Sequence, residues 1–181
     1  KPARMALSLV LQAGIDPDCF PFPFHQALDP EEQAALANQV HTGFNTPKTS
    51  SVGRLFDGVA ALIGLHQQIS YEAQNAIALE TIADSDEQSS YDFPIEDGQI
   101  LVSPVIQAIV EDIKQKVAPA VISARFHNGL SACVVNVSQQ IRSQTGLRQV
   151  ALSGGVWQNK TLIRHTITAL RESGFDVFWP R

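Results

Sequence analysis

The residues best placed to do chemistry lie in segment 150–159, Val-Ala-Leu-Ser-Gly-Gly-Val-Trp-Gln-Asn. Gly154 and Gly155 separate an expected strand from an expected helix. Without side chains they let the backbone approach a ligand, and their N–H groups would point along the helix's positive end, which suits a phosphate. Asn159, one turn into that helix, would be within reach of a ribose or a base. The glycine pair equally suits an ordinary strand-to-helix turn that needs it only for its dihedral angles.

Two carboxylates are further candidates for contact with a ligand's hydroxyl groups. Asp57 follows Arg54 at a spacing of three in an expected helix, so the two share a face and Arg54 would orient the carboxylate. Glu72 begins the next expected helix and is likewise placed to accept from a sugar hydroxyl. Each also has a plain structural interpretation: a surface ion pair for Asp57, and a first-turn carboxylate complementing the helix dipole for Glu72.

The sequence argues against a metal centre and against a nucleophilic triad. Its five histidines show no HxxxH or HExxH spacing, and Cys19 and Cys133 form no CxxC pair. Ser153 precedes the glycines without the GxSxG pattern of a nucleophile elbow, and the glycine pair matches neither a Walker A motif nor GxGxxG. His127, beside an expected core position, is predicted to pack or cap rather than to catalyse.

The composition is that of an ordinary globular domain and narrows the classes of partner. The 181 residues are 44% hydrophobic and 17% charged, with a net charge of −5. An acidic chain without a Lys/Arg cluster is not expected to bind a nucleic-acid backbone. Because no apolar run approaches the roughly 20 residues of a membrane span and no signal peptide is visible, we expect a cytoplasmic protein without a membrane partner.

The elements that must position these residues fall into two expected parts. Residues 1–118 are predicted to form a mainly helical subdomain with a short hairpin across an Asp-Gly turn, and one of its helices to run over 71–83. Residues 119–181 are predicted to form a long helix followed by strand, helix and strand, with the strands at 149–152 and 175–179. A strand–helix–strand unit predicts a parallel pair of strands in the nucleotide-binding subdomain.

Taken together, four blocks resemble the hydrogenase-maturation carbamoyltransferases of the HypF family, in the same order. They are residues 50–64, 71–80, 124–130 and 152–159, and the similarity runs from about residue 4 onward. A weaker similarity extends to the tRNA threonylcarbamoyl-transferase domain and to antibiotic carbamoyltransferases.

This resemblance implies an α/β fold of the actin/Hsp70-like (ASKHA, RNase H-like) nucleotide-binding type, with a largely helical insertion and incomplete in this chain. It implies a carbamoyltransferase that uses carbamoyl phosphate and ATP with Mg²⁺, passes through carbamoyl adenylate, and carbamoylates the C-terminal cysteine of a partner maturation protein of the HypE family. By the same resemblance, Gly154 and Gly155 would hold phosphate, while Asn159, Asp57 and Glu72 would contact the adenosine.

The sequence also departs from the family's pattern. Where the family usually has Tyr-Glu-Gly-Gln-Ala-Ala, this chain has Ala73 and Asn75. The family's histidine-rich metal motif is expected before residue 1 and its Asp-Gly-Gly motif after residue 181. We therefore expect a fragment that cannot complete carbamoyl transfer alone, and a family metal ion only in the full-length protein. Two other interpretations stay open: a tRNA threonylcarbamoyl-transferase-like enzyme, and a non-catalytic nucleotide-binding or interaction module.

Overall fold

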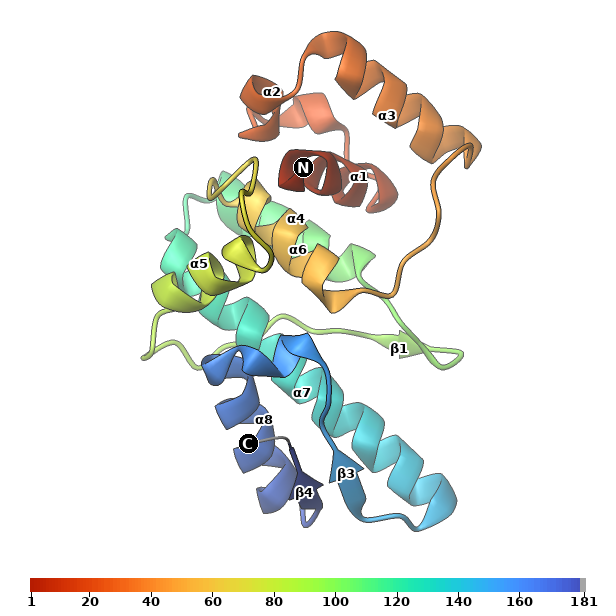
Figure 1. Ribbon diagram of the computed structural model, residues 1–181, viewed down its shortest axis with the longest axis vertical. Helices are drawn as coiled ribbons and strands as arrows, with labels where there is room; N and C mark the ends of the chain where they lie inside the picture. Colours follow the sequence, from red (N-terminus) through yellow and green to blue (C-terminus); the bar gives the residue numbers. More distant parts are fainter. Residues whose placement is uncertain (180–181) are drawn as a thin grey trace.

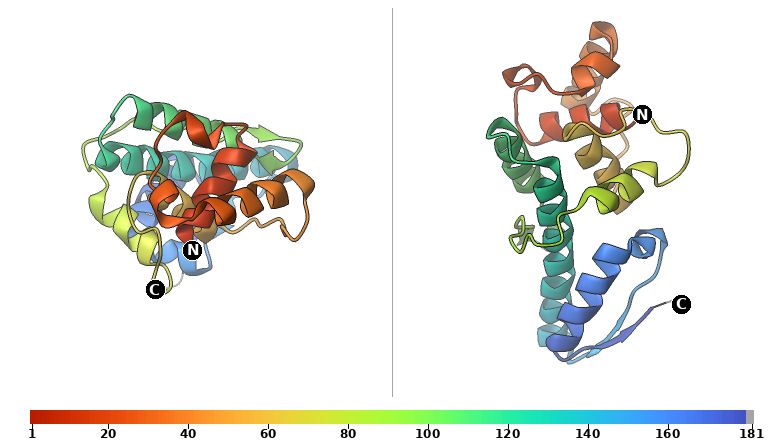
Figure 2. Two further views of the ribbon diagram at one scale, coloured as in Figure 1. Left: turned by 90° about the horizontal axis from the view of Figure 1, so that it is seen from above. Right: turned by 90° about the vertical axis from the view of Figure 1, so that its left-hand side faces the viewer.

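One long helix, α7, connects the two ends of the molecule. The computed structural model describes residues 1–179, and α7 runs lengthwise through the lower part of the molecule with some of the helices packed against it, while the N-terminal helices lie at the other end (Figure 1, Figure 2). In chain order the elements are α1 (Pro2–Gln12), η1 (Pro17–Cys19), α2 (Phe24–Ala27), α3 (Pro30–Thr42), α4 (Val52–Leu62), α5 (Gln74–Ile82), β1 (Ile95–Glu96), β2 (Gln99–Ile100), α6 (Ser103–Lys114), α7 (Pro119–Thr145), β3 (Gln149–Ala151), η2 (Gly155–Gln158), α8 (Lys160–Glu172) and β4 (Asp176–Phe178).

Local capping explains where several helices begin and end. The Asp29 side chain accepts from the N–H of Glu32 at 2.8 Å before Pro30, and the Ser51 hydroxyl accepts from the N–H of Arg54 at 3.4 Å. At the other end of α7, Gly146 adopts the left-handed conformation with φ 76°. Each of these signals is local, because it depends on one residue and its near neighbours in the sequence.

The larger core lies where α1, α4, α5, α6 and α7 meet. The Phe56 ring of α4 meets the Phe126 ring of α7 edge to face, with centroids 5.1 Å apart. A short segment joins the C-terminal end of α6 to the start of α7. α6 contacts both α1 and α7. The helices of the N-terminal half therefore share one apolar interior.

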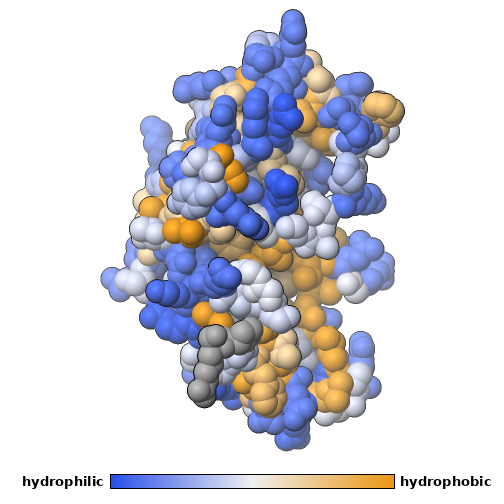
Figure 3. All heavy atoms as spheres, viewed as in Figure 1, coloured by the Kyte–Doolittle hydropathy of each residue, from blue (hydrophilic) through white to orange (hydrophobic). Residues whose placement is uncertain are grey.

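A second, smaller core holds the strand–helix–strand unit against α7. β3 and β4 pair in parallel with Val150 opposite Val177, which confirms the predicted parallel pair. Val135 of α7, Leu152, Leu170 and Phe175 make up this cluster. Hydrophobic residues gather on the lower part of the face drawn in Figure 3, over this unit. The Trp157 side chain packs against both clusters.

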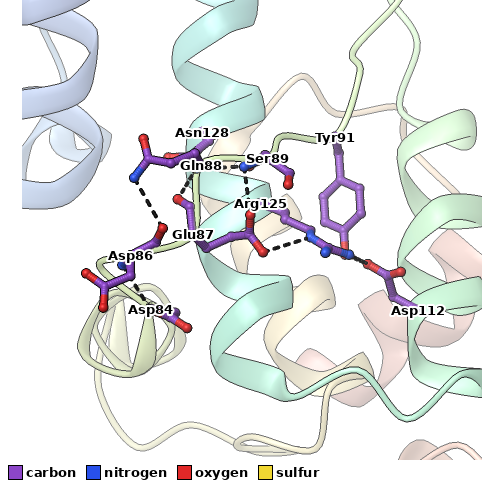
Figure 4. Close-up of polar contacts among 9 residues, drawn as sticks. All are labelled: Asp84, Asp86, Glu87, Gln88, Ser89, Tyr91, Asp112, Arg125 and Asn128. Atoms are coloured by element: carbon purple, nitrogen blue, oxygen red, sulfur yellow. Dashed lines mark hydrogen bonds and ion pairs between the residues drawn. The ribbon is translucent and has the colours of Figure 1, made fainter.

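A polar cluster fastens the segment between α5 and β1 to α6 and α7 (Figure 4). The Tyr91 hydroxyl donates to Asp112 Oδ2 at 2.6 Å, and the Arg125 guanidinium bonds the same oxygen at 2.8 Å and Glu87 at 3.3 Å. Asn128 Nδ2 donates to two backbone carbonyls of the segment at 3.0 Å. Burial and the neighbouring carboxylate raise the pKa of Tyr91, so its hydroxyl keeps the proton that it donates. Arg125 thus pairs with both carboxylates of this cluster, those of Asp112 and Glu87.

The structure corrects two of the predicted elements. The helix expected over 71–83 is α5, which begins only at Gln74 because Ala73 takes the left-handed conformation with φ 63°. The helix expected directly after the glycine turn begins at Lys160, since the short 3-10 helix η2 intervenes. The predicted hairpin is present, with two paired residues in each strand. The boundary expected between residues 118 and 119 stays a prediction, and residues 180 and 181 of the second predicted part lie outside the described residues.

Among the helices described in residues 1–179, none combines the length and the apolar character that crossing a membrane requires.

Two helical glycines differ in what a side chain would meet there. A Cβ at Gly129 would overlap the backbone oxygen of Tyr91 and press on the Phe93 ring at 3.0 Å, and neither can move without displacing the segment. A Cβ at Gly58 would overlap the end of the Leu9 side chain, which can rotate. We expect Gly129→Ala to lower the free energy of unfolding by about 2–3 kcal/mol, and Gly58→Ala by about 1 kcal/mol or less.

Urea denaturation of the two variants beside the parent chain measures this difference. Equal losses would contradict the close approach of segment 91–93 to α7.

Candidate functional site

The turn after β3 presents unused backbone donors to solvent. Gly154 has φ 100° and ψ 167°, a conformation that is essentially reserved for glycine. Both Gly154 and Gly155 are exposed, and a Cβ built on either would meet nothing within 4 Å. None of the hydrogen bonds within residues 1–179 uses the N–H of either glycine. The turn therefore offers two adjacent N–H groups on exposed residues, an arrangement suited to an anion.

Asn159 joins this turn to α8, and its side chain is committed within the protein. It is the N-cap of α8 rather than a residue one turn inside the helix, which corrects the predicted position. Its Oδ1 accepts from the N–H of Leu162 at 2.8 Å, and its Nδ2 lies 2.9 Å from Nε2 of His127. The residue is only 7% exposed. The predicted adenosine contact stays a prediction, and it would have to be made by an amide whose two ends already have partners.

The N-terminus of α8 is also occupied from within the chain. Glu80, on α5, accepts at one carboxylate oxygen from the N–H of Lys160 at 2.7 Å and of Thr161 at 3.1 Å. A carboxylate at this position complements the positive end of the helix. The expectation that the glycine N–H groups point along the positive end of α8 is therefore wrong: the glycines lie one 3-10 turn ahead of it.

Asp57 lies on α4 beside the aromatic contact between α4 and α7. Its carboxylate is partly buried and takes part in no hydrogen bond within residues 1–179. Burial raises the pKa of Asp57, and the positive charge of Arg54 opposes that shift. The preceding residue, Phe56, packs its ring edge-on against His127, with centroids 5.4 Å apart. An unpaired, partly desolvated carboxylate next to this contact is able to accept from a ligand hydroxyl.

Glu72 lies outside the helix that the sequence assigned to it. It precedes α5 in an exposed turn, so its interpretation as a first-turn carboxylate is wrong. The turn is tied to α4 by the buried Asn75, whose Nδ2 donates to His66 O at 2.9 Å and to Asp57 O at 3.4 Å. Asn75 thus links the turn that carries Glu72 to the middle of α4, where Asp57 lies.

A buried hydrogen-bond chain connects α5, from the Leu79 carbonyl, to the residue that follows the glycine turn. His127 is fully buried, which confirms the prediction that it packs. Its Nδ1 lies 2.8 Å from the carbonyl oxygen of Ser123, and the Ser123 hydroxyl donates to Leu79 O of α5 at 2.7 Å. In Figure 2, right, α4, α5 and the turn lie on the same side of α7.

The partners of His127 settle its protonation state. Because Leu162 donates to Asn159 Oδ1, the amide must present Nδ2 to the ring, so Nε2 of His127 accepts. The Ser123 carbonyl can only accept, so Nδ1 carries the single ring proton. Burial lowers the pKa of His127, the Ser123 bond and Glu80 oppose this, and His165 adds to it. The ring is therefore neutral.

Sequence reasoning missed the roles of His127 and Glu80 in this arrangement. For His127 a signal existed, since it lies four residues after Ser123 on the inner face of a helix. For Glu80 there was none, because its partners lie 80 residues further along the chain. No group of three or more His, Cys, Asp or Glu side chains that could hold a metal ion occurs in the described part of the chain.

Comparison with known proteins relates the whole chain to one family. A family model described as "Carbamoyltransferase, Kae1-like Domain, second subdomain" matches residues 1–181. The chain is 40% identical over 141 residues to carbamoyltransferase HypF of Synechocystis sp., which covers 75% of this chain and 18% of that protein. It is 31% identical over 182 residues to carbamoyltransferase HypF of Rhizobium leguminosarum, which covers 100% of this chain and 23% of that protein.

Two solved structures share the fold. A full-length HypF in its phosphate- and nucleotide-bound form is 32% identical with a TM-score of 0.83, over 98% of this chain and 23% of that one. HypF of T. kodakarensis is 27% identical with a TM-score of 0.80, over 98% and 24%. The chain thus spans about a fifth of the length of the relatives that it matches. The family model describes a Kae1-like domain, and these likenesses confirm the expected α/β fold of the actin/Hsp70-like (ASKHA) type, present here in part.

The left-handed backbone at Ala73 is expected to lower the stability of the fold. A non-glycine residue at φ 63° costs about 1 kcal/mol relative to glycine. We expect Ala73→Gly to raise the free energy of unfolding by about 0.5–1 kcal/mol, the gain being reduced by the greater freedom of glycine in the unfolded chain. Ala76→Gly, inside α5, is the matched control and should destabilise by a similar amount. Chemical denaturation measures both, and a loss of stability in Ala73→Gly would contradict the strained turn.

The neutral His127 makes folding stability depend on pH. Because the pKa of His127 is lowered in the folded state, the unfolded chain takes up a proton more readily below about pH 6.5. The stability present at about pH 8 is therefore lost as the pH falls, by about 1.4 kcal/mol for each unit of the lowering. Melting temperatures between about pH 8 and pH 5 measure the loss, which should be smaller in His127→Gln.

Burial also lowers the pKa of His165, so His165→Gln serves as the control for a second titrating ring. Identical pH profiles for the parent chain and His127→Gln would show that His127 contributes nothing to the loss.

Proposed function

The chain belongs to the HypF carbamoyltransferases, as the second subdomain of their Kae1-like domain, and from this we propose that it forms a nucleotide-binding wall for carbamoyl transfer in hydrogenase maturation. The observation that carries this proposal is the pair of unused, exposed N–H groups at Gly154 and Gly155. The likeness to a HypF described as phosphate- and nucleotide-bound supports it.

In this proposal the turn binds the phosphate of carbamoyl adenylate. Two adjacent backbone N–H groups without a partner favour a negative charge, and the absence of side chains leaves room for a tetrahedral group. Mg²⁺ would enter with the phosphates of ATP, as it does where a site supplies few carboxylates of its own. The chain would thus hold the adenylate by its charged end.

The sugar hydroxyls are assigned to the two free carboxylates, Asp57 and Glu72. Asp57 lies in the middle of α4 and Glu72 in the turn before α5, and neither carboxylate is engaged by a hydrogen bond within residues 1–179. Asn159 is placed differently, because both ends of its amide are bonded inside the protein. Deprotonated Asp57 and Glu72 would each accept from a hydroxyl of the ribose.

The transfer step then uses the phosphate as a leaving group. The thiol sulfur of the partner protein's C-terminal cysteine attacks the carbamoyl carbon, the bond from that carbon to the phosphate oxygen breaks, and AMP leaves with the electron pair. The thiol gives its proton to solvent or to a base. The N–H groups of Gly154 and Gly155 would stabilise the charge that develops on the phosphate. The partner is proposed to be a HypE-type maturation protein.

Because the chain spans about a fifth of its relatives, the complete reaction is assigned to a longer protein and not to this chain alone. We expect the 181-residue chain, mixed with carbamoyl phosphate, ATP and the partner's thiol, to give no thiocarbamate by mass spectrometry. Product formation by the chain alone would overturn this division of labour.

Calorimetric titration of the chain with AMP and with inorganic phosphate tests the binding site directly. Gly155 has no positive φ and open space above it, so Gly155→Asp and Gly155→Asn should both fold. The two side chains have nearly the same size, and only the first brings a negative charge. We expect the Asp variant to bind at least about tenfold more weakly than the Asn variant. Equal affinities, or no affinity in the parent chain, would remove the phosphate site from this turn.

A further inference from the structure

We propose that His127, acting through Asn159, is a positioning residue that holds the Gly154–Gly155 turn in its anion-binding geometry. The proposal rests on the function proposed above and assigns Asn159 a role behind the site in place of a contact with the ligand. Its basis is the 2.9 Å bond between the two side chains, both of them buried.

The turn has few other attachments. On its first side, β3 is held by the N–H of Leu152, which donates to Phe178 O at 2.8 Å. The next six residues carry the glycines and η2, and all six are exposed or only partly buried. Among them, Val156 and Trp157 pack against the hydrophobic clusters. The first fully buried residue on the second side is Asn159, whose N–H also closes η2 onto Val156 O at 3.2 Å. Asn159 therefore fixes the point from which the turn departs.

The direction of every bond behind Asn159 depends on the state of one ring. With Nε2 of His127 unprotonated, Asn159 donates to the ring and keeps Oδ1 for the N–H of Leu162. A proton on Nε2 would place two donors against each other and favour rotation of the amide by half a turn. That rotation would take Oδ1 away from the N-cap, and the start of α8 together with the end of η2 would lose its fixed geometry.

The groups around His127 hold it in the neutral state. From α5 Glu80 faces it and favours a proton, whereas from α8 His165 opposes one. From α4 the neighbour is the Phe56 ring, and on α7 itself Ser123 supplies the carbonyl acceptor. Full burial outweighs the attraction of Glu80. The positioning pair is thus built for neutral and mildly alkaline conditions.

Two conservative variants separate the positioning role from mere packing. In His127→Gln the amide oxygen can take the place of Nε2 and accept from Asn159, while the donor to Ser123 is lost. In His127→Asn the shorter amide can take the place of Nδ1 and donate to the Ser123 carbonyl, while the bond to Asn159 is lost. Both variants remove the ring, and both disturb packing to a similar degree.

The first measurement needs no ligand. We expect the amide resonances and hydrogen exchange of Gly154 and Gly155 at about pH 8 to resemble the parent chain in His127→Gln and to change in His127→Asn. Equal changes in both variants, or none in either, would overturn the positioning role and leave His127 as a packing residue.

The second measurement is the affinity for AMP by calorimetry at the same pH. We expect His127→Asn to bind about tenfold more weakly and His127→Gln to stay within about threefold of the parent chain, since only the former loses the hydrogen bond to Asn159. If the parent chain binds no AMP, the proposed function fails, and the amide measurement still decides the positioning role. If the parent chain binds and both variants bind equally well, the inference fails while the site stands.

A reversed pH profile provides a final test. Asn159→Asp keeps an oxygen for the N–H of Leu162 and turns the other oxygen toward Nε2, so it requires a protonated His127. We expect the turn's amide resonances in this variant to approach those of the parent chain as the pH falls from about 8 to 5.5, whereas those of the parent chain diverge. Parallel pH courses in the two proteins would contradict the coupling.

Discussion

A buried polar group in a protein interior must find a partner, and in this molecule one chain of such partners determines how three helices meet. It runs from the Leu79 carbonyl through Ser123 and His127 to Asn159 and Leu162, so it passes from α5 through α7 to α8. Each member can donate or accept in only one direction once its neighbour is set, because the Leu162 N–H and the two carbonyls fix the ends. Low polarity around the chain raises the cost of any missing bond.

The buried hydrogen-bond chain and the nearby glycine turn differ in whether their donors and acceptors already have partners. Behind Asn159 the donors and acceptors of the chain are paired, and Glu80 occupies the start of α8. In front of it the N–H groups of the exposed Gly154 and Gly155 have no partner within residues 1–179. A paired hydrogen-bond chain beside two free donors favours electrostatic preorganisation, because the donors need not reorient when a charge arrives.

Much of the fold could be predicted from the sequence because its signals are local. Asp29 and Ser51 as helix caps, Gly146 as a helix end and the parallel pair β3–β4 each follow from a few adjacent residues. The predictions were wrong where residues far apart in the sequence determine the local structure. Nothing near Asn159 shows that its amide faces inward to a histidine 32 residues away, and the backbone at Ala73 can be recognised as left-handed only in the folded chain. The glycine turn lies where the sequence predicts it. The intervening η2, and the contact of Glu80 with the start of α8, were not predicted.

The length of α7 affects how the protein unfolds. Its 27 residues pass through both hydrophobic clusters, with Phe126 in the larger and Val135 in the smaller. Loss of packing in either cluster would expose apolar side chains of α7 that the other cluster also needs in place. Trp157 contacts both clusters, so we expect their packing to be coupled. We therefore expect unfolding to be a single cooperative event in which the amides at the middle of α7 exchange last, although the outline of the chain suggests two separate lobes.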